Sequence, residues 1–279
     1  MKTVKAELIK ETVKKMCIEA NCNLPEDIYR CIRHGLSIEE SSEGKKILSD
    51  LIENANYAKE QNMPICQDTG MAVFFVSVGQ EVYIDGNLTE AINGGVRDGY
   101  EEGYLRKSVV IDPLRRVNTK DNTPAVIHYD IVPGDKIEIT FAPKGFGSEN
   151  MGGLKMLKPS DGEKGVMDFV VKTVEEAGPN PCPPIVVGVG IGGTMEKAAL
   201  LAKKALTREA DSKSEDEYYA AMEEELLHRI NSLGIGPQGL GGRVTALGVN
   251  IETFPSHIAG LAVCVNIGCH VTRHLTKTL

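Results

Sequence analysis

The chain has 279 residues, of which 42% are hydrophobic and 25% charged, so it can bury one large core or two smaller ones without covalent crosslinks. Its net charge of −8 argues against binding to nucleic acid or to a membrane surface. It does not argue against a small anionic substrate, because the local charge of a cleft decides whether such a substrate binds. No signal-peptide core and no run of 18 apolar residues occurs, so we expect a cytoplasmic protein with no membrane contact.

The first part of the chain is mostly helical in pattern. Apolar spacing and helix-start residues predict five elements before residue 104. They are helices over 4–20, 25–34 and 41–61, a buried strand over 71–78, and a helix over 88–103. Residues 1–62 are therefore expected to form a helical N-terminal section.

The next two segments, 125–132 and 136–142, have the features of a β-hairpin. The second segment alternates between apolar and polar residues, and Pro133-Gly134-Asp135 between the two is a turn sequence. We therefore expect these two strands to pair with each other.

The second half of the chain alternates between helices and strands. The expected elements are helices over 163–177, 194–206 and 211–233, and strands over 185–189, 244–252 and 258–265. Glycine-rich segments cover 144–153 and 234–242, and the latter is the best candidate for a hinge or a site loop. The predicted fold class is mixed α/β (α+β), a helical N-terminal section followed by mixed sheets with helices.

Seven cysteines are present, an odd number in a chain too large to need disulfides, so we expect thiols or metal ligands. Cys66, Cys182 and Cys269 are flanked by Gly, Pro or polar residues, which places them on loops. Three converging loop thiolates suit an iron–sulfur cluster with one iron left open for catalysis. The remaining four lie in helical patterns or in an apolar strand and are expected to be core residues: Cys17, Cys22, Cys31 and Cys264.

The triplet Asp68-Thr69-Gly70 follows Cys66 and Gln67. It matches the aspartic-protease triplet, but its flanking residues do not suit that class, and one copy would need a homodimer to supply the second carboxylate. Two interpretations remain open. Asp68 caps a turn, or Gln67 holds a substrate oxygen while Asp68 orients a ligand or acts in proton transfer.

A glycine pattern over 188–193 matches the dinucleotide fingerprint, because it follows a predicted strand and precedes a predicted helix. The acidic residue at the end of a second strand, about 20 residues further on, is missing. A nicotinamide cofactor is therefore disfavoured, although amides at a helix start still suit a carboxylate or a cluster sulfur.

Two basic or imidazole side chains are candidates for substrate contact. Arg106 suits a bidentate grip on a carboxylate, and its alternative is a solvated surface arginine. His257 precedes an apolar strand and is either a hydrogen-bond donor to substrate or a turn residue. Arg273, four residues after Cys269, is either a partner for a nearby thiolate or a surface residue.

Several motifs together resemble a known family. The chain has Cys66-Gln-Asp-Thr-Gly, Arg106 after Gly-Tyr-Leu, Gly145-Phe-Gly-Ser-Glu-Asn, Gly178-Pro-Asn-Pro-Cys-Pro-Pro, Ser256-His257 and Cys269-x-x-x-Arg273. In this order they are similar to the N-terminal catalytic domain of class I iron–sulfur hydro-lyases, which include class I fumarases and L(+)-tartrate dehydratases. The resemblance covers residues from about 5 to the C-terminus and implies that residues 1–279 are one catalytic domain of this type.

The resemblance implies a [4Fe–4S] cluster on Cys66, Cys182 and Cys269, with one iron not bound by cysteine. It implies that a small dicarboxylate contacts Gln67, Asp68, Arg106, Gly147 and His257, with Asp68 and His257 catalytic. Cys264 is the alternative to Cys269 as the third ligand.

Because the chain ends at Leu279, the resemblance also implies an α subunit with a separate β subunit, in an α2β2 assembly. We expect a fumarate hydratase, an enzyme that catalyses a reaction of the tricarboxylic acid cycle. L(+)-tartrate dehydratase is the alternative, and a non-catalytic iron–sulfur sensing module a remote one.

Overall fold

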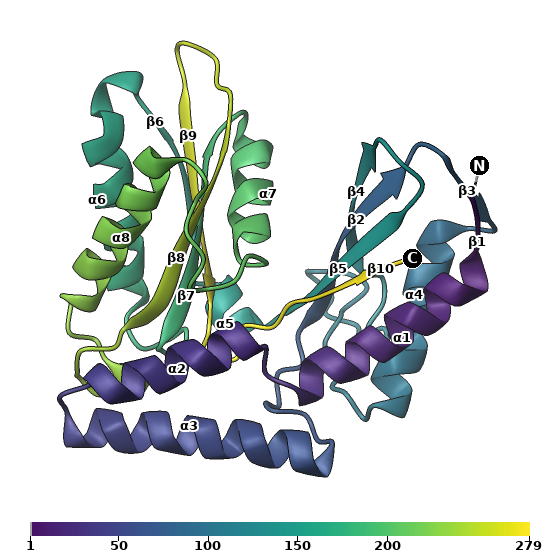
Figure 1. Ribbon diagram of the computed structural model, residues 1–279, viewed down its shortest axis with the longest axis horizontal. Helices are drawn as coiled ribbons and strands as arrows, with labels where there is room; N and C mark the ends of the chain where they lie inside the picture. Colours follow the sequence, from purple (N-terminus) through teal and green to yellow (C-terminus); the bar gives the residue numbers. More distant parts are fainter. Residues whose placement is uncertain (1) are drawn as a thin grey trace. The chain divides into compact units, whose positions relative to one another are not determined.

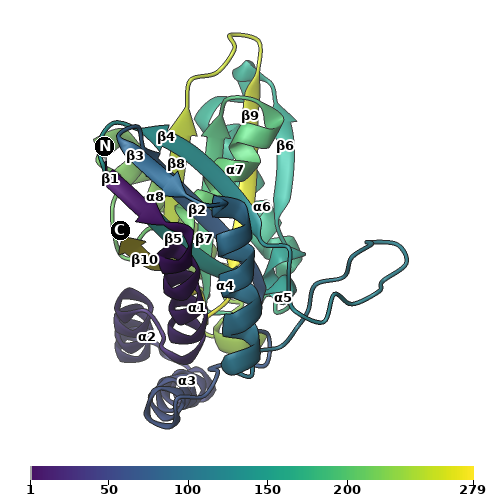
Figure 2. The ribbon, with the colours of Figure 1, turned by 90° about the vertical axis from the view of Figure 1, so that its right-hand side faces the viewer.

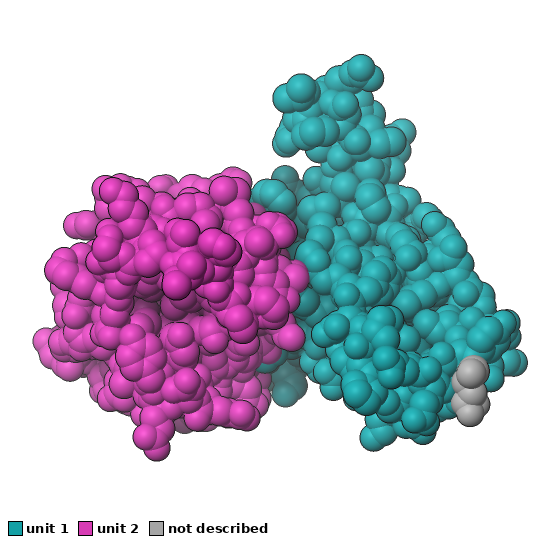
Figure 3. All heavy atoms as spheres, turned by 90° about the horizontal axis from the view of Figure 1, so that it is seen from above, with its two compact units in different colours: residues 1–25, 57–146, 273–279 teal, residues 26–56, 147–272 magenta. Residues whose placement is uncertain are grey.

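The computed structural model describes residues 2–279, which divide into two compact units (Figure 3). Unit 1 is built from three stretches of the chain and unit 2 from two. Unit 1 comprises Met1–Pro25, Tyr57–Phe146 and Arg273–Leu279, and unit 2 comprises Glu26–Asn56 and Gly147–Thr272. The N-terminal helices are therefore shared between the units.

Unit 1 combines a four-stranded sheet with two packed helices (Figures 1 and 2). Its elements are β1 (Lys2–Lys5), α1 (Ala6–Cys22), β2 (Met71–Gly79), β3 (Val82–Asp85), α4 (Leu88–Glu102), β4 (Val126–Val132), β5 (Ile137–Lys144) and β10 (Leu275–Thr278). The strand order is β10-β5-β2-β4, while β1 and β3 form a separate parallel pair. In the core Phe74 of β2 stacks on Phe141 of β5 with 4.8 Å between ring centroids.

Helices α1 and α4 pack closely because α4 presents glycines to α1. A Cβ added at Gly95 would lie 2.5 Å from the carbonyl oxygen of Lys10, and one at Gly99 would lie 2.8 Å from the Cβ of Cys17. Larger side chains would force the helices apart.

The expected hairpin over 125–142 is wrong. β4 and β5 belong to one sheet, but β2 lies between them and pairs with β4 in parallel and with β5 antiparallel. β2 is the more buried strand and therefore takes the central place, whereas β4 is largely exposed. The turn instead crosses the end of β2, where Gly134 accepts a hydrogen bond from the amide of Glu81 at 2.9 Å.

Unit 2 is a sheet with helices on both faces (Figure 1). Its elements are α2 (Glu26–Ile38), β6 (Gly153–Leu157), α6 (Gly162–Ala177), β7 (Ile185–Gly192), α7 (Met195–Ala205), α8 (Glu217–Asn231), β8 (Ala246–Phe254), β9 (Leu261–Gly268) and the short helices Pro159–Asp161 and Pro237–Gly239. The strand order is β6-β9-β7-β8, and β7 is buried along its whole length. Two helices, α3 (Ser42–Gln61) and α5 (Phe146–Glu149), run across a unit boundary.

The glycines of the dinucleotide-like pattern have a packing role. A Cβ added at Gly188 would lie 2.2 Å from the carbonyl oxygen of Ala202 in α7, and one at Gly190 would lie 2.1 Å from that of Ala198. The pattern is thus explained by the close approach of α7 to β7.

The predicted mixed α/β class is confirmed, with differences at particular elements. The helix expected over 211–233 begins only at Glu217, because the Asp216 side chain accepts the amide of Tyr218 at 2.9 Å and caps the helix there. The last expected strand runs over Leu261–Gly268, so Cys264 lies mid-strand as predicted. No helix within residues 2–279 is long and apolar enough to span a membrane.

Candidate active site

The loop that carries Cys66 lies in unit 1 and is folded around Asp68. The amide of Asp68 donates to the Cys66 Sγ at 3.4 Å, while its carboxylate accepts the amides of Gly70 at 3.0 Å and of Phe146 at 2.9 Å. The turn-capping interpretation of Asp68 is therefore confirmed. Gly70 has φ +76°, and a Cβ there would lie 2.7 Å from the amide nitrogen of Lys144, so glycine is required.

Three buried polar side chains hold the carbonyl groups of this loop. The Tyr100 hydroxyl donates to the carbonyls of Thr69 at 2.8 Å and of Gly70 at 3.1 Å. Asn122 donates to Gly70 at 3.2 Å, and Arg273 donates to the carbonyl of Asp68 at 3.0 Å. Burial raises the pKa of Tyr100 far above its ordinary value, so its hydroxyl stays a donor. The backbone of the loop is thereby held in place by side chains of the protein interior.

Arg106 is exposed, but its backbone is tied to the same loop. Its amide donates to the Thr69 Oγ1 at 2.9 Å. Asn122 also accepts the amides of Ser108 at 2.7 Å and of Val109 at 3.2 Å, so one buried amide side chain links Gly70 to the segment after Arg106. Asp68 and Arg106 thus share one rigid support. Gln67 is exposed on this loop.

Unit 2 brings Cys182 and Cys269 to one end of its sheet. Cys182 precedes β7 and has φ +57°, while Cys269 follows β9, the antiparallel neighbour of β7. The carbonyl of Cys182 accepts the backbone amide of His270 at 3.4 Å, and the Nδ1 of His270 lies 3.0 Å from it. The exposed Gly147 belongs to the same end, where a Cβ would lie 3.8 Å from the carbonyl of Asn180.

Two residues of this region were missed at the level of sequence. Gln238 donates from its side chain to the carbonyl of Pro183 at 2.7 Å and lies 3.3 Å from the His270 ring. The signals that point to them are the glycine-rich stretch 234–242 and the position of His270 beside Cys269. The stretch 234–242, predicted to be a hinge or a site loop, thus reaches the segment that carries Cys182 through Gln238.

His257 is not placed beside these cysteines. It lies on the exposed loop between β8 and β9, where its Nδ1 accepts the amide of Ala259 at 3.2 Å. The eight residues of β9 separate this loop from Cys269, which corresponds to about 25 Å along the strand. Within unit 2, His257 and the pair Cys182 and Cys269 therefore lie at opposite ends of the sheet.

The seven thiols fall into two groups by their exposure. Cys182 is exposed, and Cys66 and Cys269 are half-buried. The other four are buried, and burial raises the pKa of Cys31 to about 12 and that of Cys264 to about 11. The accessible thiols fit a metal-ligand role better than the buried ones, and this favours Cys269 over Cys264. Among residues 2–279, neither unit by itself assembles three His, Cys, Asp or Glu side chains as a metal site.

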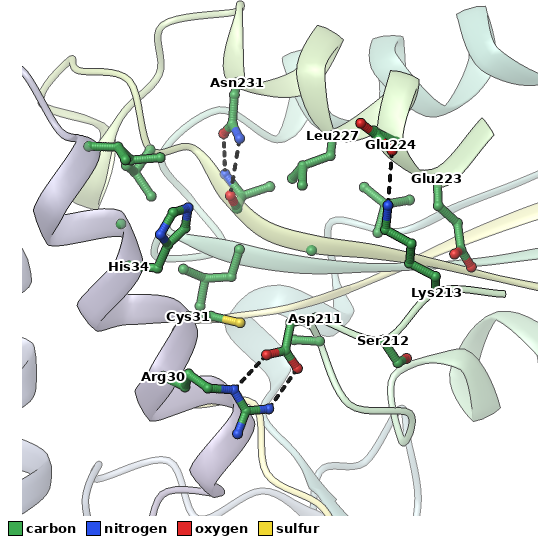
Figure 4. A pocket seen from close by; sticks show the side chains of 18 of the residues that line it. Arg30, Cys31, His34, Asp211, Ser212, Lys213, Glu223, Glu224, Leu227 and Asn231 are labelled. Carbon is green, nitrogen blue, oxygen red and sulfur yellow. Dashed lines mark hydrogen bonds and ion pairs between the residues drawn. The ribbon is translucent and has the colours of Figure 1, made fainter. Parts of the chain in front are cut away.

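A separate cavity of about 580 Å³ lies in unit 2 between α2, α8 and β8 (Figure 4). Its charged side chains are paired: Arg30 binds Asp211 through two contacts of 2.6 and 2.8 Å, and Lys213 binds Glu224 at 3.1 Å. It includes none of the predicted site residues.

A family match and two related proteins agree on the family to which this chain belongs. The family described as "Fumarate hydratase (Fumerase)" matches residues 10–278. A protein of Methanocaldococcus jannaschii, provisionally named L(+)-tartrate dehydratase subunit alpha, is 44% identical over 97% of both chains. The L(+)-tartrate dehydratase subunit alpha of Escherichia coli strain UTI89 is 36% identical over 95% of this chain and 89% of its own length. The chain therefore belongs to the fumarate hydratase (Fumerase) family and is a hydro-lyase chain of the α-subunit type.

Proposed function

We propose that this chain is the α subunit of an iron–sulfur hydro-lyase that removes water from a hydroxy-dicarboxylate. The observation that carries the proposal is the division of the thiols: Cys66, Cys182 and Cys269 are accessible on loops fixed by hydrogen bonds, whereas the other four are buried. Two substrates are candidates.

L(+)-tartrate, converted to oxaloacetate, is favoured by the names of the relatives at 44% and 36% identity. The interconversion of L-malate and fumarate, which the sequence analysis placed first, is favoured by the description of the matching family.

In this proposal Cys66, Cys182 and Cys269 hold a [4Fe–4S] cluster with one iron free of cysteine. When bound, the cluster supplies a Lewis acid that makes hydroxide a feasible leaving group. The chain's contribution is the fixed presentation of the three thiolates. Gly70 allows the tight turn after Cys66, and His270 holds the backbone of Cys182.

Substrate binding is proposed for Arg106, Gln67, Asp68 and Gly147. The exposed guanidinium of Arg106 is suited to a bidentate grip on one carboxylate. Asp68 is held in one orientation by two amide donors, so its carboxylate can accept or return a proton without reorganising. Gly147 offers a backbone that a dicarboxylate can approach closely.

A separate β subunit is proposed as partner, because the relatives are named as alpha subunits. We further propose the α2β2 assembly, in which His257 of one α chain serves the site of the other copy. The position of His257 at the opposite end of the sheet from Cys182 and Cys269 supports this arrangement. A mixture of His257→Asn and Arg106→Ala complexes should then regain part of the activity that each lacks alone.

The test is anaerobic reconstitution of the α chain together with its partner chain, followed by assays with L(+)-tartrate, L-malate and fumarate. A value of kcat/KM at least about tenfold higher for one substrate decides between the two candidates. Loss of activity in Cys269→Ser, with activity retained in Cys264→Ser, supports the ligand set. The hydro-lyase proposal fails if the complex holds a cluster but turns over none of the three substrates.

A further inference from the structure

The segment 107–121, named the arm below, projects from unit 1 between α4 and β4 (Figure 2). Its two sides are tied together by hydrogen bonds. The amide of Thr119 donates to the carbonyl of Val109 at 2.9 Å, and that of Ile111 donates to the carbonyl of Val117 at 2.7 Å. The arm is therefore an ordered, hairpin-like projection.

The tip of the arm is a turn built on Asp112. Its carboxylate accepts the amides of Leu114 at 2.9 Å and of Arg115 at 2.6 Å, and its carbonyl accepts the amide of Arg116 at 2.9 Å. These bonds use the acidic side chain inside the turn and leave Leu114 at the apex.

Three aliphatic side chains of the tip are directed into solvent. Ile111 is 73% exposed, Leu114 is 90% exposed and Val117 is 58% exposed. An ordered projection that presents three aliphatic side chains in seven residues is typical of a surface that is covered in an assembly.

The charge of the tip is opposite to that of the whole chain. Arg115 and Arg116 form no ion pair within residues 2–279, whereas Asp112 is used in the turn and Asp121 pairs with Arg97 at 3.1 Å. A cationic tip on a chain of net charge −8 selects a partner surface that carries carboxylates around an apolar pocket.

The root of the arm is part of the candidate active site. Arg106 precedes the arm, and Asn122 follows it and holds both Gly70 and the amide of Ser108. A chain that completes the substrate site beside Arg106 therefore lies next to the arm. This continuity favours the separate β chain over a second α copy as the occupant.

We propose that the arm is the docking element through which this chain binds its β subunit, with Leu114 in an apolar pocket and Arg115 and Arg116 against carboxylates. The inference rests on the proposed function only in taking the partner to be the chain that completes the site. Because the arm leads directly from Arg106, docking also fixes that arginine in its place.

The experiment measures the dissociation constant of the α–β complex, by titrating purified β chain into purified α chain. Leu114→Asp should raise it by about tenfold or more, equivalent to roughly 1.4 kcal/mol. Leu8→Asp is the matched control, because Leu8 is 52% exposed in the same unit, and it should leave the constant unchanged. Arg115→Glu with Arg116→Glu should slow association and reverse its salt dependence, because added salt then screens a repulsion between like charges.

Circular dichroism of each variant verifies that an exposed substitution leaves the fold intact. The proposal is wrong if Leu114→Asp changes the α–β constant by less than about twofold, or if wild-type α and β do not associate. It is also wrong if Leu114→Asp only dissociates α–α dimers. A complex that docks through the arm yet lacks hydro-lyase activity would overturn the proposed function and leave this inference standing.

Discussion

Arg273 and Asp68 are joined by a 3.0 Å hydrogen bond from guanidinium to carbonyl, although 205 positions separate them in the chain. A second guanidinium nitrogen donates to the Oδ1 of Asn21 at 2.8 Å, and Arg273 is only 3% exposed. The last segment of the chain thus supports the loop that carries Cys66. This arginine is a buried structural support within unit 1 and not the surface residue that its sequence context also allowed.

Replacing Arg273 by lysine should destabilise the protein. Lysine cannot reach both acceptors with a fork of donors, so one buried acceptor is left unsatisfied at a cost of roughly 1–3 kcal/mol. Urea unfolding measures the change, with Arg229→Lys as the control, because Arg229 pairs with Glu225 at the surface. An equal effect of the two substitutions would contradict the supporting role.

Asn122→Ala should weaken substrate binding more than it slows turnover. The variant removes the link between Gly70 and Ser108, so Arg106 loses its fixed position relative to Asp68. We expect KM to rise by about tenfold with a smaller change in kcat. Asn23→Ala is the control, because the Asn23 side chain caps α1 with a single exposed bond to Glu19. An unchanged KM in a folded variant would count against the link.

Thiol chemistry should separate the ligand candidates from the core cysteines. In the cluster-free protein, Cys66, Cys182 and Cys269 should be alkylated first at pH 8. Cys31 and Cys264, with pKa values raised by burial to about 12 and about 11, hold almost no thiolate at that pH and should react slowly. Mass spectrometry of partial digests gives the order, and early labelling of Cys264 ahead of Cys269 would reverse the ligand assignment.

Acid should destabilise unit 2 through Glu39, which is 2% exposed. Burial alone would raise the pKa of this carboxyl, but backbone amides of Arg243, Ser41, Val244 and Glu40 lower it below its ordinary value of 4.5. The charged form therefore stabilises the fold above about pH 4.5, and this contribution is lost as the pH falls through the lowered value.

The corresponding variant is Glu39→Gln, which should be less stable by roughly 1–3 kcal/mol at pH 7, with a deficit that shrinks as the pH is lowered to 3. The exposed Glu40→Gln serves as control. Chemical unfolding at both pH values is the measurement, and a deficit that stays constant with pH would contradict the role of the carboxylate.

The sequence predicted which segments form helices and strands better than it predicted which strands pair with each other. The segments β2, β4 and β5 were recognised from composition and alternation, but their pairing was not, because a turn sequence reports only local geometry and β2 ends 47 positions before β4 begins. Short strands such as β1 and β10 were missed because four residues carry little periodicity.

The same distinction between local and long-range information applies to the site residues. The position of Cys66, Cys182 and Cys269 on loops could be predicted from the sequence, because Gly and Pro are typical of loops. The supporting side chains Tyr100 and Asn122 carry no local signal, because their partners are distant carbonyl groups. The position of His257 at the far end of β9 depends on strand direction, which no motif encodes.

The last strand has a consequence for synthesis. β10 pairs with β5 through Leu275–Thr278, and the amide of Leu279 donates to the carbonyl of Ile137 at 2.8 Å. All of unit 2 precedes these residues in the chain, so unit 1 lacks an edge strand and the Arg273 support until the last residue of unit 2 has been added. Unit 1, with its Cys66 loop, can therefore be completed only after the whole of unit 2 has been synthesised.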